Sequence, residues 1–248
     1  WEIVTSAQVV SRDDGAWVLL SDRVRDLSLI LTNTGRLSRY KLEGTEVIYL
    51  YPKDPDGRLV ETIGHSLAYF GRILGPYPYP RLVVAQVPLS GNQGMEFSGM
   101  ILLNSSLESP VALAVHEIAH QWWYGVVGSD QIHEPWIDEG LTTYLTMLYL
   151  EDRYGSRTYT DKEPYYQSLS NLGLPLSTTL EEFPSEASYR VTAYGKGAAV
   201  WVMARKFLGK QGLERFLRDT YIKHRFGIVD GEVLLQELEE ATVRAQVR

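Results

Sequence analysis

The sequence predicts an α+β fold in which strands come first and helices follow, with the change near residue 108. Two observations support this order. The first third of the chain contains short segments rich in Val, Ile, Leu and Tyr, separated by turn sequences such as Asn33-Thr34-Gly35. Beyond residue 109, apolar residues recur at the spacing of helices that bury one face.

The strand region is expected to contain four early strands, at 3–10, 16–20, 24–31 and 47–51. A helix over 59–74 follows, because Ile63, Leu67 and Phe70 lie on one stripe at helical spacing. The proline-rich segment 75–80 ends that helix. Two more strands, with a glycine-rich loop between them, are expected at 82–87 and 100–103, with the loop at 90–94.

The helical region begins with residues that are typical of a helix start. Ser109 can cap the first turn, and Pro110 fits the first helical position. This helix is expected to run to about Tyr124. A second helix is expected over 135–154, where Gly155 would end it. Weaker helical patterns occupy 161–171, 193–208 (ended by Gly209), 213–224 and 231–244.

Composition narrows the functional classes. The chain has 248 residues, 22% of them charged, and a net charge of −7, which argues against nucleic acid as a partner. It has no cysteine, so thiolate catalysis and cysteine-based metal sites are excluded. No apolar run approaches the roughly 20 residues of a membrane span. Because residue 1 is Trp and no basic segment followed by an apolar core opens the chain, we expect an excised or processed chain, and the sequence does not indicate its compartment.

One short motif carries the chemistry: His116-Glu117-Ile118-Ala119-His120, an HExxH pattern on a predicted helix. Residues four apart lie on the same helix face, so both imidazoles can bind one Zn²⁺. Glu117 points about 100° away from His116 and is suited to activate a water beside the metal. With five histidines in the chain, two surface histidines at this spacing by chance are a poor alternative.

A zinc site of this kind needs a third protein ligand and an open fourth position. Glu139 is the candidate, 19 positions after His120 and in the first turn of the next predicted helix. A helix, a loop and a returning antiparallel helix would bring it back to the histidines.

These residues resemble a known family. The string HEIAHQWWYGVVGSDQIHEPWIDEG is similar to the M1 family of zinc aminopeptidases, and HExxH followed by Glu139 is the gluzincin signature. Gly94-Met95-Glu96 resembles the family's Gly-x-Met-Glu-Asn exopeptidase motif. Tyr194-Gly195-Lys196-Gly197 resembles its Tyr-x-Lys-Gly segment, which bears the catalytic tyrosine.

The resemblance implies a role for each matching residue. His116, His120 and Glu139 would bind one Zn²⁺ per chain, Glu117 would be the general base, and Tyr194 would hydrogen-bond the oxyanion.

On the substrate side, Glu96 would bind the free α-ammonium of a peptide. The backbone of Gly94 and Met95 would pair with the peptide as an added strand. The partners implied are therefore peptides with a free N-terminus.

The resemblance also implies an architecture. The fold would be a thermolysin-like catalytic domain, with a mixed β-sheet lobe, a helical lobe and zinc in the cleft between them. Residues 1–50 would be the last strands of a preceding β-rich domain, and 51–248 the catalytic domain. Flanking domains of the full-length protein are expected to be missing.

Two positions depart from the family pattern. Phe97 stands where the exopeptidase motif usually has Asn, and Thr146 stands where many members have Glu. The loss of this Asn leaves open an endopeptidase similar to thermolysin. A zinc-binding scaffold without catalysis is a further alternative, because some domains that resemble the M1 family are scaffolds. The sequence does not indicate a side-chain preference for the substrate.

Overall fold

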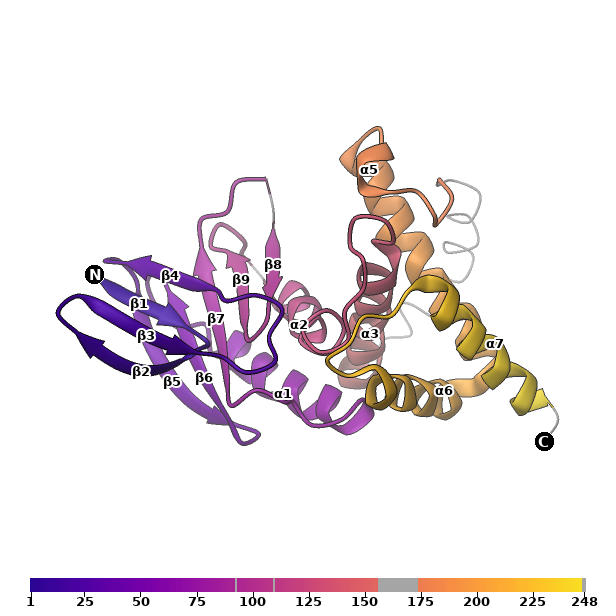
Figure 1. Ribbon diagram of the computed structural model, residues 1–248, viewed down its shortest axis with the longest axis horizontal. Coiled ribbons are helices and arrows are strands. Elements are labelled where there is room, and N and C mark those ends of the chain that lie inside the picture. Colours follow the sequence, from indigo (N-terminus) through magenta and orange to yellow (C-terminus); the bar gives the residue numbers. More distant parts are fainter. Residues whose placement is uncertain (92, 109, 156–173, 247–248) are drawn as a thin grey trace. The chain divides into compact units, whose positions relative to one another are not determined.

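Strands fill the first part of the chain and helices the second, as the sequence predicts (Figure 1). The structure is a computed structural model that describes residues 1–91, 93–108, 110–155 and 174–246. The chain forms two units. The first unit comprises Trp1–Arg72 and Pro76–Val126, and the second comprises Ile73–Gly75 and Val127–Arg248.

A five-stranded sheet is the centre of the first unit. Its strands are β5 (Arg36–Leu42), β6 (Thr45–Tyr51), β7 (Arg81–Val87), β8 (Gly94–Phe97) and β9 (Met100–Asn104). They lie in the order β5-β6-β7-β9-β8. The pairs β6–β7 and β7–β9 are parallel, and the outer pairs β5–β6 and β8–β9 are antiparallel. The short strand β8 is therefore an edge strand.

Four more strands form two antiparallel pairs, β1 (Glu2–Thr5) with β4 (Leu29–Thr32), and β2 (Gln8–Asp13) with β3 (Ala16–Leu20). The strand expected at 3–10 is in fact two strands, and the one expected at 24–31 forms only at its end. Neither β5 nor β8 was expected from the sequence. β5 alternates charged with apolar residues at a sheet edge, and β8 is short and begins with glycine, so neither has the apolar run typical of a buried strand.

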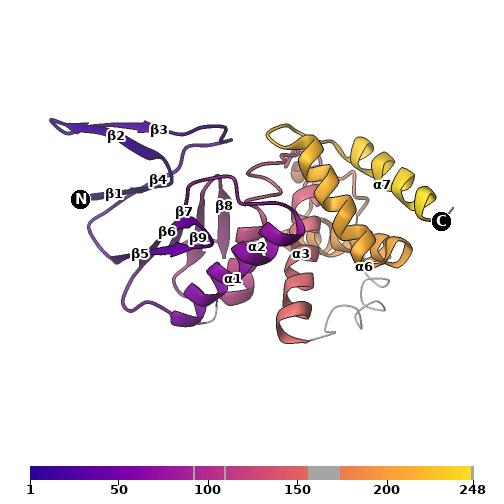
Figure 2. The same ribbon diagram turned by 90° about the horizontal axis from the view of Figure 1, so that it is seen from below.

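The sheet buries both faces. On one face, Ile48, Leu50, Val83 and Met100 pack with Val4 of β1. On the other, the helix α1 (Gly57–Ile73) buries the stripe predicted from its helical spacing. Figure 2 shows the sheet between the β1–β4 pair and α1. Because side chains alternate along a strand, each position on β8 has a fixed side of the sheet.

The helix that carries the HExxH motif, α2 (Val111–Ala119), also belongs to the first unit and is shorter than expected. The chain leaves the helix after His120 through tight turns, in which the Gln121 and Trp122 N–H groups bond carbonyls three residues back. Trp122 and Trp123 are fully buried, which pulls this segment into the core instead of along a helix axis. Ser109, the expected cap, lies outside the described residues.

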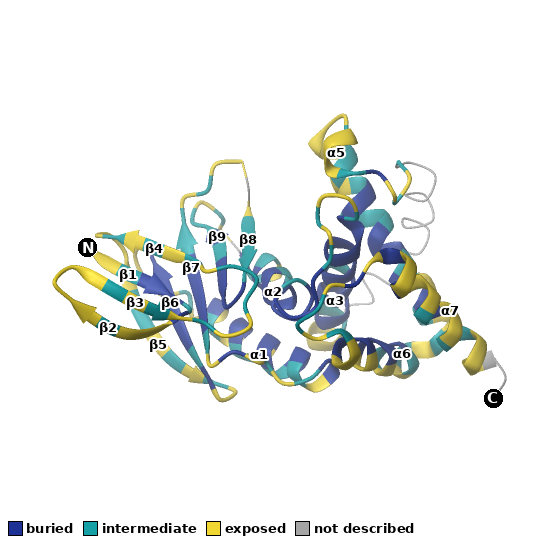
Figure 3. Cartoon of the chain, in the orientation of Figure 1, coloured by how far each residue is buried: buried dark blue, intermediate teal, exposed yellow. Residues whose placement is uncertain are grey.

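The second unit is helical within the described ranges. Its elements are α3 (Trp136–Tyr154), the 3₁₀ turn η1 (Leu180–Glu182), α5 (Glu186–Tyr189), the π-helix η2 (Arg190–Lys196), α6 (Gly197–His224) and α7 (Gly231–Gln246). Figure 3 shows α3 buried along most of its length. Gly155 adopts a left-handed conformation and ends α3, as predicted. The helix expected at 161–171 lies outside the described residues.

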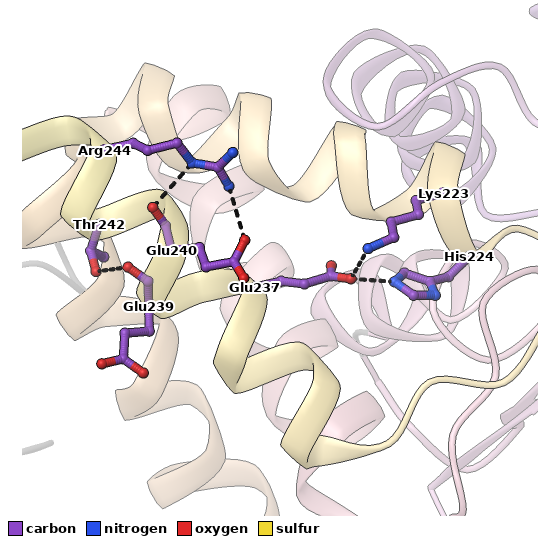
Figure 4. A network of polar contacts seen from close by, with 7 residues as sticks. All are labelled: Lys223, His224, Glu237, Glu239, Glu240, Thr242 and Arg244. Carbon is purple, nitrogen blue, oxygen red and sulfur yellow. Dashed lines mark hydrogen bonds and ion pairs between the residues drawn. The ribbon is translucent and has the colours of Figure 1, made fainter.

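Two predicted helices run together as α6, with Gly209 as the break between them (φ 68°, ψ 166°). Ion pairs then connect the helices of this unit. Arg205 of α6 binds Glu151 of α3 through two hydrogen bonds of 2.8 and 2.9 Å. Glu237 of α7 accepts hydrogen bonds from the consecutive α6 residues Lys223 and His224, as Figure 4 shows.

Among the helices that the structure describes, none combines the length and the apolar character needed to cross a membrane. The division of the chain at residue 50 stays a prediction. β6, which ends at Tyr51, pairs with β7 in the same sheet.

Candidate functional site

The two histidines of the motif lie on one face of α2. Their Nε2 atoms are 3.2 Å apart, and the ring planes are nearly perpendicular. The other ring nitrogen of His120, Nδ1, lies 3.2 Å from the backbone oxygen of Trp123. A proton on Nδ1 bonded to that carbonyl leaves the lone pair of Nε2 on the shared side.

This arrangement fits a zinc ion. Two nitrogen ligands at about 2.0–2.1 Å from a tetrahedral Zn²⁺ lie roughly 3.3 Å apart. The observed separation of His116 and His120 Nε2 is 3.2 Å. Imidazole held by a hydrogen bond to its second nitrogen is also the usual form of a zinc-binding histidine.

Two carboxylates of the same unit lie close to His120. Glu117 of α2 is buried, and Glu96 lies on β8. One ligand atom each from Glu96, Glu117 and His120 lie within 4.8 Å of one another. The first unit therefore places a second carboxylate, on a strand, next to the carboxylate of the HExxH motif.

Gly94 explains how the strand and the helix come so close. A Cβ atom at this position would lie 2.3 Å from Oε1 of Glu117. The Glu117 carboxylate thus occupies the space that a side chain at the start of β8 would need. Because side chains alternate along the strand, Gly94 and Glu96 share the face toward α2.

Phe97, the departure from the family motif, points the other way. Its ring packs against the apolar core on the opposite side of the sheet, with Met95 on the same side by alternation. The side chain at this position therefore contributes to the core on the face opposite Glu96.

In the second unit, Glu139 and Tyr194 are in contact. The Tyr194 phenol donates a 2.6 Å hydrogen bond to Oε1 of Glu139, which is buried in the first turn of α3. Tyr194 belongs to the π-helix η2, an irregularity that is frequent at functional sites. Tyr189, in the helical turn before η2, packs edge-on against Tyr194 with ring centroids 5.7 Å apart.

Two glycines of the sequence motifs allow this contact. A Cβ on Gly140 would lie 2.6 Å from the Cα of Gly197. The start of α6 therefore rests directly on the backbone of α3, one residue after Glu139 and three residues after Tyr194. Thr146, the other departure from the family pattern, donates its hydroxyl to the Thr142 carbonyl of its own helix at 2.8 Å.

Sequence reasoning missed a group of polar residues around the turn between β8 and β9. Gln121 donates to the Phe97 carbonyl at 3.0 Å and accepts from the Gly99 N–H at 2.8 Å. Asp26 accepts a 2.6 Å hydrogen bond from the Tyr124 phenol. Gln121 could have been noticed because it follows His120 directly, but no local signal marks Asp26.

Burial is the main reason why the pKa of Tyr124 is raised; its hydrogen bond to Asp26 and the charges of Asp26 and Glu96 add to this effect. The phenol therefore keeps its proton and remains a donor.

The predicted site residues fall into both units. His116, His120, Glu117, Glu96, Gly94 and Met95 belong to the first, and Glu139 and Tyr194 to the second. The structure brings together the members of each group within their own unit.

The chain is similar to known proteins in sequence and in fold. The profile of the peptidase family M1 domain matches residues 60–248. The tricorn protease-interacting factor F2 of Thermoplasma acidophilum is 25% identical over an alignment that covers 92% of this chain and 30% of that protein. Human aminopeptidase N is 28% identical, over 62% of this chain and 19% of its own length.

The fold is also found among solved structures. An M1 zinc metallopeptidase from Deinococcus radiodurans superimposes with a TM-score of 0.76 at 22% identity, over 99% of this chain and 60% of that one. The sheet lobe and the helical lobe expected from the sequence are thus the M1 metallopeptidase fold. The chain spans about a fifth to a third of the length of the curated relatives described above.

Proposed function

The chain belongs to peptidase family M1, and from this premise we propose that it is a zinc-dependent aminopeptidase that removes N-terminal residues from peptides. The names of its relatives support the class of reaction, since human aminopeptidase N is among them. The observation that carries the proposal is the cluster of Glu96, Glu117 and His120. In this cluster the carboxylate proposed to bind an amine lies next to the proposed base and a proposed metal ligand.

We assign His116, His120 and Glu139 as the ligands of one Zn²⁺. The separation of the two histidine nitrogens supports the first pair. The gluzincin spacing supports Glu139, whose carboxylate is buried and hydrogen-bonded in its own unit. Bound Zn²⁺ would supply a Lewis acid that polarises the scissile carbonyl and acidifies the attacking water.

Glu117 is the proposed general base. Its carboxylate accepts a proton from the attacking water and then donates that proton to the nitrogen of the departing amine, so that no proton is lost or gained overall. Its contact with Gly94 fixes the carboxylate against β8, close to where a peptide would bind. A fixed base needs no reorganisation during the reaction.

Tyr194 is the proposed donor to the oxyanion that develops on the peptide carbonyl. A phenol O–H can donate to this oxygen without itself changing charge. Its hydrogen bond to Glu139 holds the ring in one orientation before substrate binds. The oxyanion would take over the donor that now bonds Glu139.

Glu96 is the proposed anchor of the substrate α-ammonium. A carboxylate there binds a free amino terminus and sets cleavage one residue away from it. The position of β8 at the edge of the sheet supports the pairing of Gly94 and Met95 with an extended peptide.

The test measures zinc content and hydrolysis on one sample of the purified protein. We expect about one zinc per chain, together with chelator-sensitive release of p-nitroaniline from leucine p-nitroanilide. The N-acetylated substrate should not be hydrolysed, because it has no ammonium for Glu96. Equal hydrolysis of both substrates would instead identify an endopeptidase. Bound zinc without hydrolysis of either substrate would identify a non-catalytic scaffold.

A further inference from the structure

We propose that Arg25 and Asp26 form a clamp that positions Glu96 relative to the histidine helix α2, and so sets the affinity for the substrate amine. The inference rests on the proposed function. It gives a role to two residues that lie outside every motif of the sequence, in the segment between β3 and β4. We call these two residues the Arg25–Asp26 clamp.

One side of the clamp holds the strand that carries Glu96. The Ser98 N–H donates to both carboxylate oxygens of Asp26, at 3.2 and 3.3 Å. The Ser98 hydroxyl accepts from the backbone N–H of Arg25 at 3.1 Å. Ser98 is fully buried and lies two residues after Glu96, so these bonds fix the end of β8.

The other side of the clamp holds the segment that leaves α2. The Tyr124 phenol donates to Oδ2 of Asp26 at 2.6 Å. The Arg25 guanidinium donates to the Tyr124 carbonyl and, at 3.1 Å, to the Val126 carbonyl. Asp26 thus binds the phenol of Tyr124, and Arg25 binds its backbone carbonyl. Tyr124 lies four residues after His120.

The backbone of Tyr124 adopts a strained conformation at this contact. Its φ is 143°, in the range that favours glycine and strains any other residue. Such conformations persist where the surroundings enforce them, and they cluster at functional sites. A glycine would remove the strain here but could not reach Asp26.

Gln121 supplies a second connection between the same two segments. It bonds the Phe97 carbonyl and the Gly99 N–H, on either side of Ser98. With one tie from Gln121 and one from the clamp, the turn after β8 has little freedom to shift relative to α2. Glu96 is close enough for its charge to raise the pKa of Tyr124, after the larger effects of burial and Asp26.

The experiment compares Asp26→Asn and Tyr124→Phe with the control Asp22→Asn. Asp22 is a carboxylate of the same segment whose side chain is 80% exposed. In the zinc-loaded protein, we expect each of the two clamp variants to raise KM for leucine p-nitroanilide about tenfold, as for one lost charged hydrogen bond. The kcat and the zinc content should stay within about twofold of the wild-type values, which is small beside the tenfold change expected in KM. Asp22→Asn should change none of these values.

The double variant Asp26→Asn/Tyr124→Phe tests whether the two residues act through one contact. We expect its KM to match that of either single variant, because residues of one hydrogen bond are not additive. A KM equal to the product of the single effects would show two independent roles and overturn the clamp. Should Asp26→Asn fail to fold, Tyr124→Phe tests the same contact.

A second measurement is independent of catalysis. Leucinamide, which has a free amine, is titrated into chelator-treated protein, with N-acetyl-leucinamide as the blocked control. We expect both clamp variants to weaken leucinamide binding about tenfold. The proposal is wrong if Asp26→Asn behaves as Asp22→Asn, or if it lowers kcat or zinc content and leaves KM unchanged.

Failure of the proposed function is recognised separately. If the zinc-loaded wild type hydrolyses nothing, the aminopeptidase proposal fails, and the leucinamide titration still decides the clamp. If the wild type does not bind leucinamide at all, the clamp has no amine site to position and both proposals fail.

Discussion

The two units hold their chemical groups by different physical means. In the first, the turn after β8 and Tyr124 are held by directional hydrogen bonds that Gln121 and Asp26 accept. In the second, Glu139 and Tyr194 meet because Gly140 and Gly197 let two helix backbones touch. Polar substitutions are therefore expected to change function in the first unit, whereas added side-chain volume should destabilise the second.

The largest effect is expected for Glu117, the proposed general base in the first unit. Glu117→Gln keeps the shape of the side chain but cannot accept the proton of the water. We expect kcat to fall by about 10²–10⁴-fold, which is the usual contribution of a general base. Zinc content, measured by elemental analysis, should be unchanged.

The matched control for this substitution is Glu108→Gln, an exposed glutamate of the same unit. It should keep full activity. If Glu117→Gln also keeps activity, the proposed mechanism is wrong.

The second largest effect is expected at Glu96. Replacing it with Gln removes the negative charge and keeps the volume of the side chain. Glu96→Gln should raise KM for leucine p-nitroanilide between about 10- and 100-fold, because the substrate ammonium loses a charged partner. Steady-state kinetics on the zinc-loaded protein measure this value. An unchanged KM would place the amine-binding group elsewhere.

In the second unit, a single methyl group should be harmful. A Cβ at position 197 would lie 2.9 Å from the Gly140 Cα and 3.0 Å from the Trp136 carbonyl oxygen. Gly197→Ala should therefore lower the free energy of unfolding by about 1–3 kcal/mol, as overpacking does. Urea denaturation followed by circular dichroism measures this change.

The contrast comes from the first unit. At Gly71 of α1, nothing lies within 4 Å of the place that an added Cβ would occupy. Gly71→Ala should be neutral or stabilise by up to about 1 kcal/mol, as for alanine in a helix. If both substitutions have the same effect, the close approach of α3 and α6 does not depend on these glycines.

The smallest effect is expected from the ion pairs between α6 and α7. Burial opposes the charge of Glu237, but hydrogen bonds from Lys223 and His224 outweigh it, and the pKa of Glu237 is lowered from 4.5. The folded state therefore binds this proton more weakly than the unfolded chain. The stabilisation is complete above pH 4.5 and is lost at lower pH, as the pH falls through the lowered pKa.

Thermal melts of wild type and Glu237→Gln across this range test the pair. The variant should be less stable at pH 7 by under about 1 kcal/mol, because Lys223 is largely exposed. The difference should shrink as the pH falls below 4.5. A difference that stays constant with pH would show that Glu237 acts through packing and not through charge.

The sequence was most informative where the chemistry lies within one helix or one short motif. His116 and His120 are four residues apart, so helix periodicity alone places them together. Glu139 and Tyr194 were each found in a motif, but their hydrogen bond joins residues 55 positions apart. The Asp26–Tyr124 bond spans 98 positions and has no sequence pattern, so only the fold reveals it.

The strand β8 and the end of α2 differ from the sequence prediction for a similar reason. β8 contains Glu96 yet has no apolar run, because only Phe97 and Met95 face the core. The end of α2 was misplaced because Trp122 and Trp123 continue an apolar helical pattern. Their burial is decided by the core around them and not by local propensity.

The π-helix before α6 has a consequence for how this site can change. A π-turn is an α-helix with one residue inserted, and one residue corresponds to about 100° of rotation around a helix axis. Deleting a single residue from Arg190–Lys196 would restore regular winding and turn the Tyr194 phenol away from Glu139. The number of residues in this segment therefore determines which of its side chains faces Glu139.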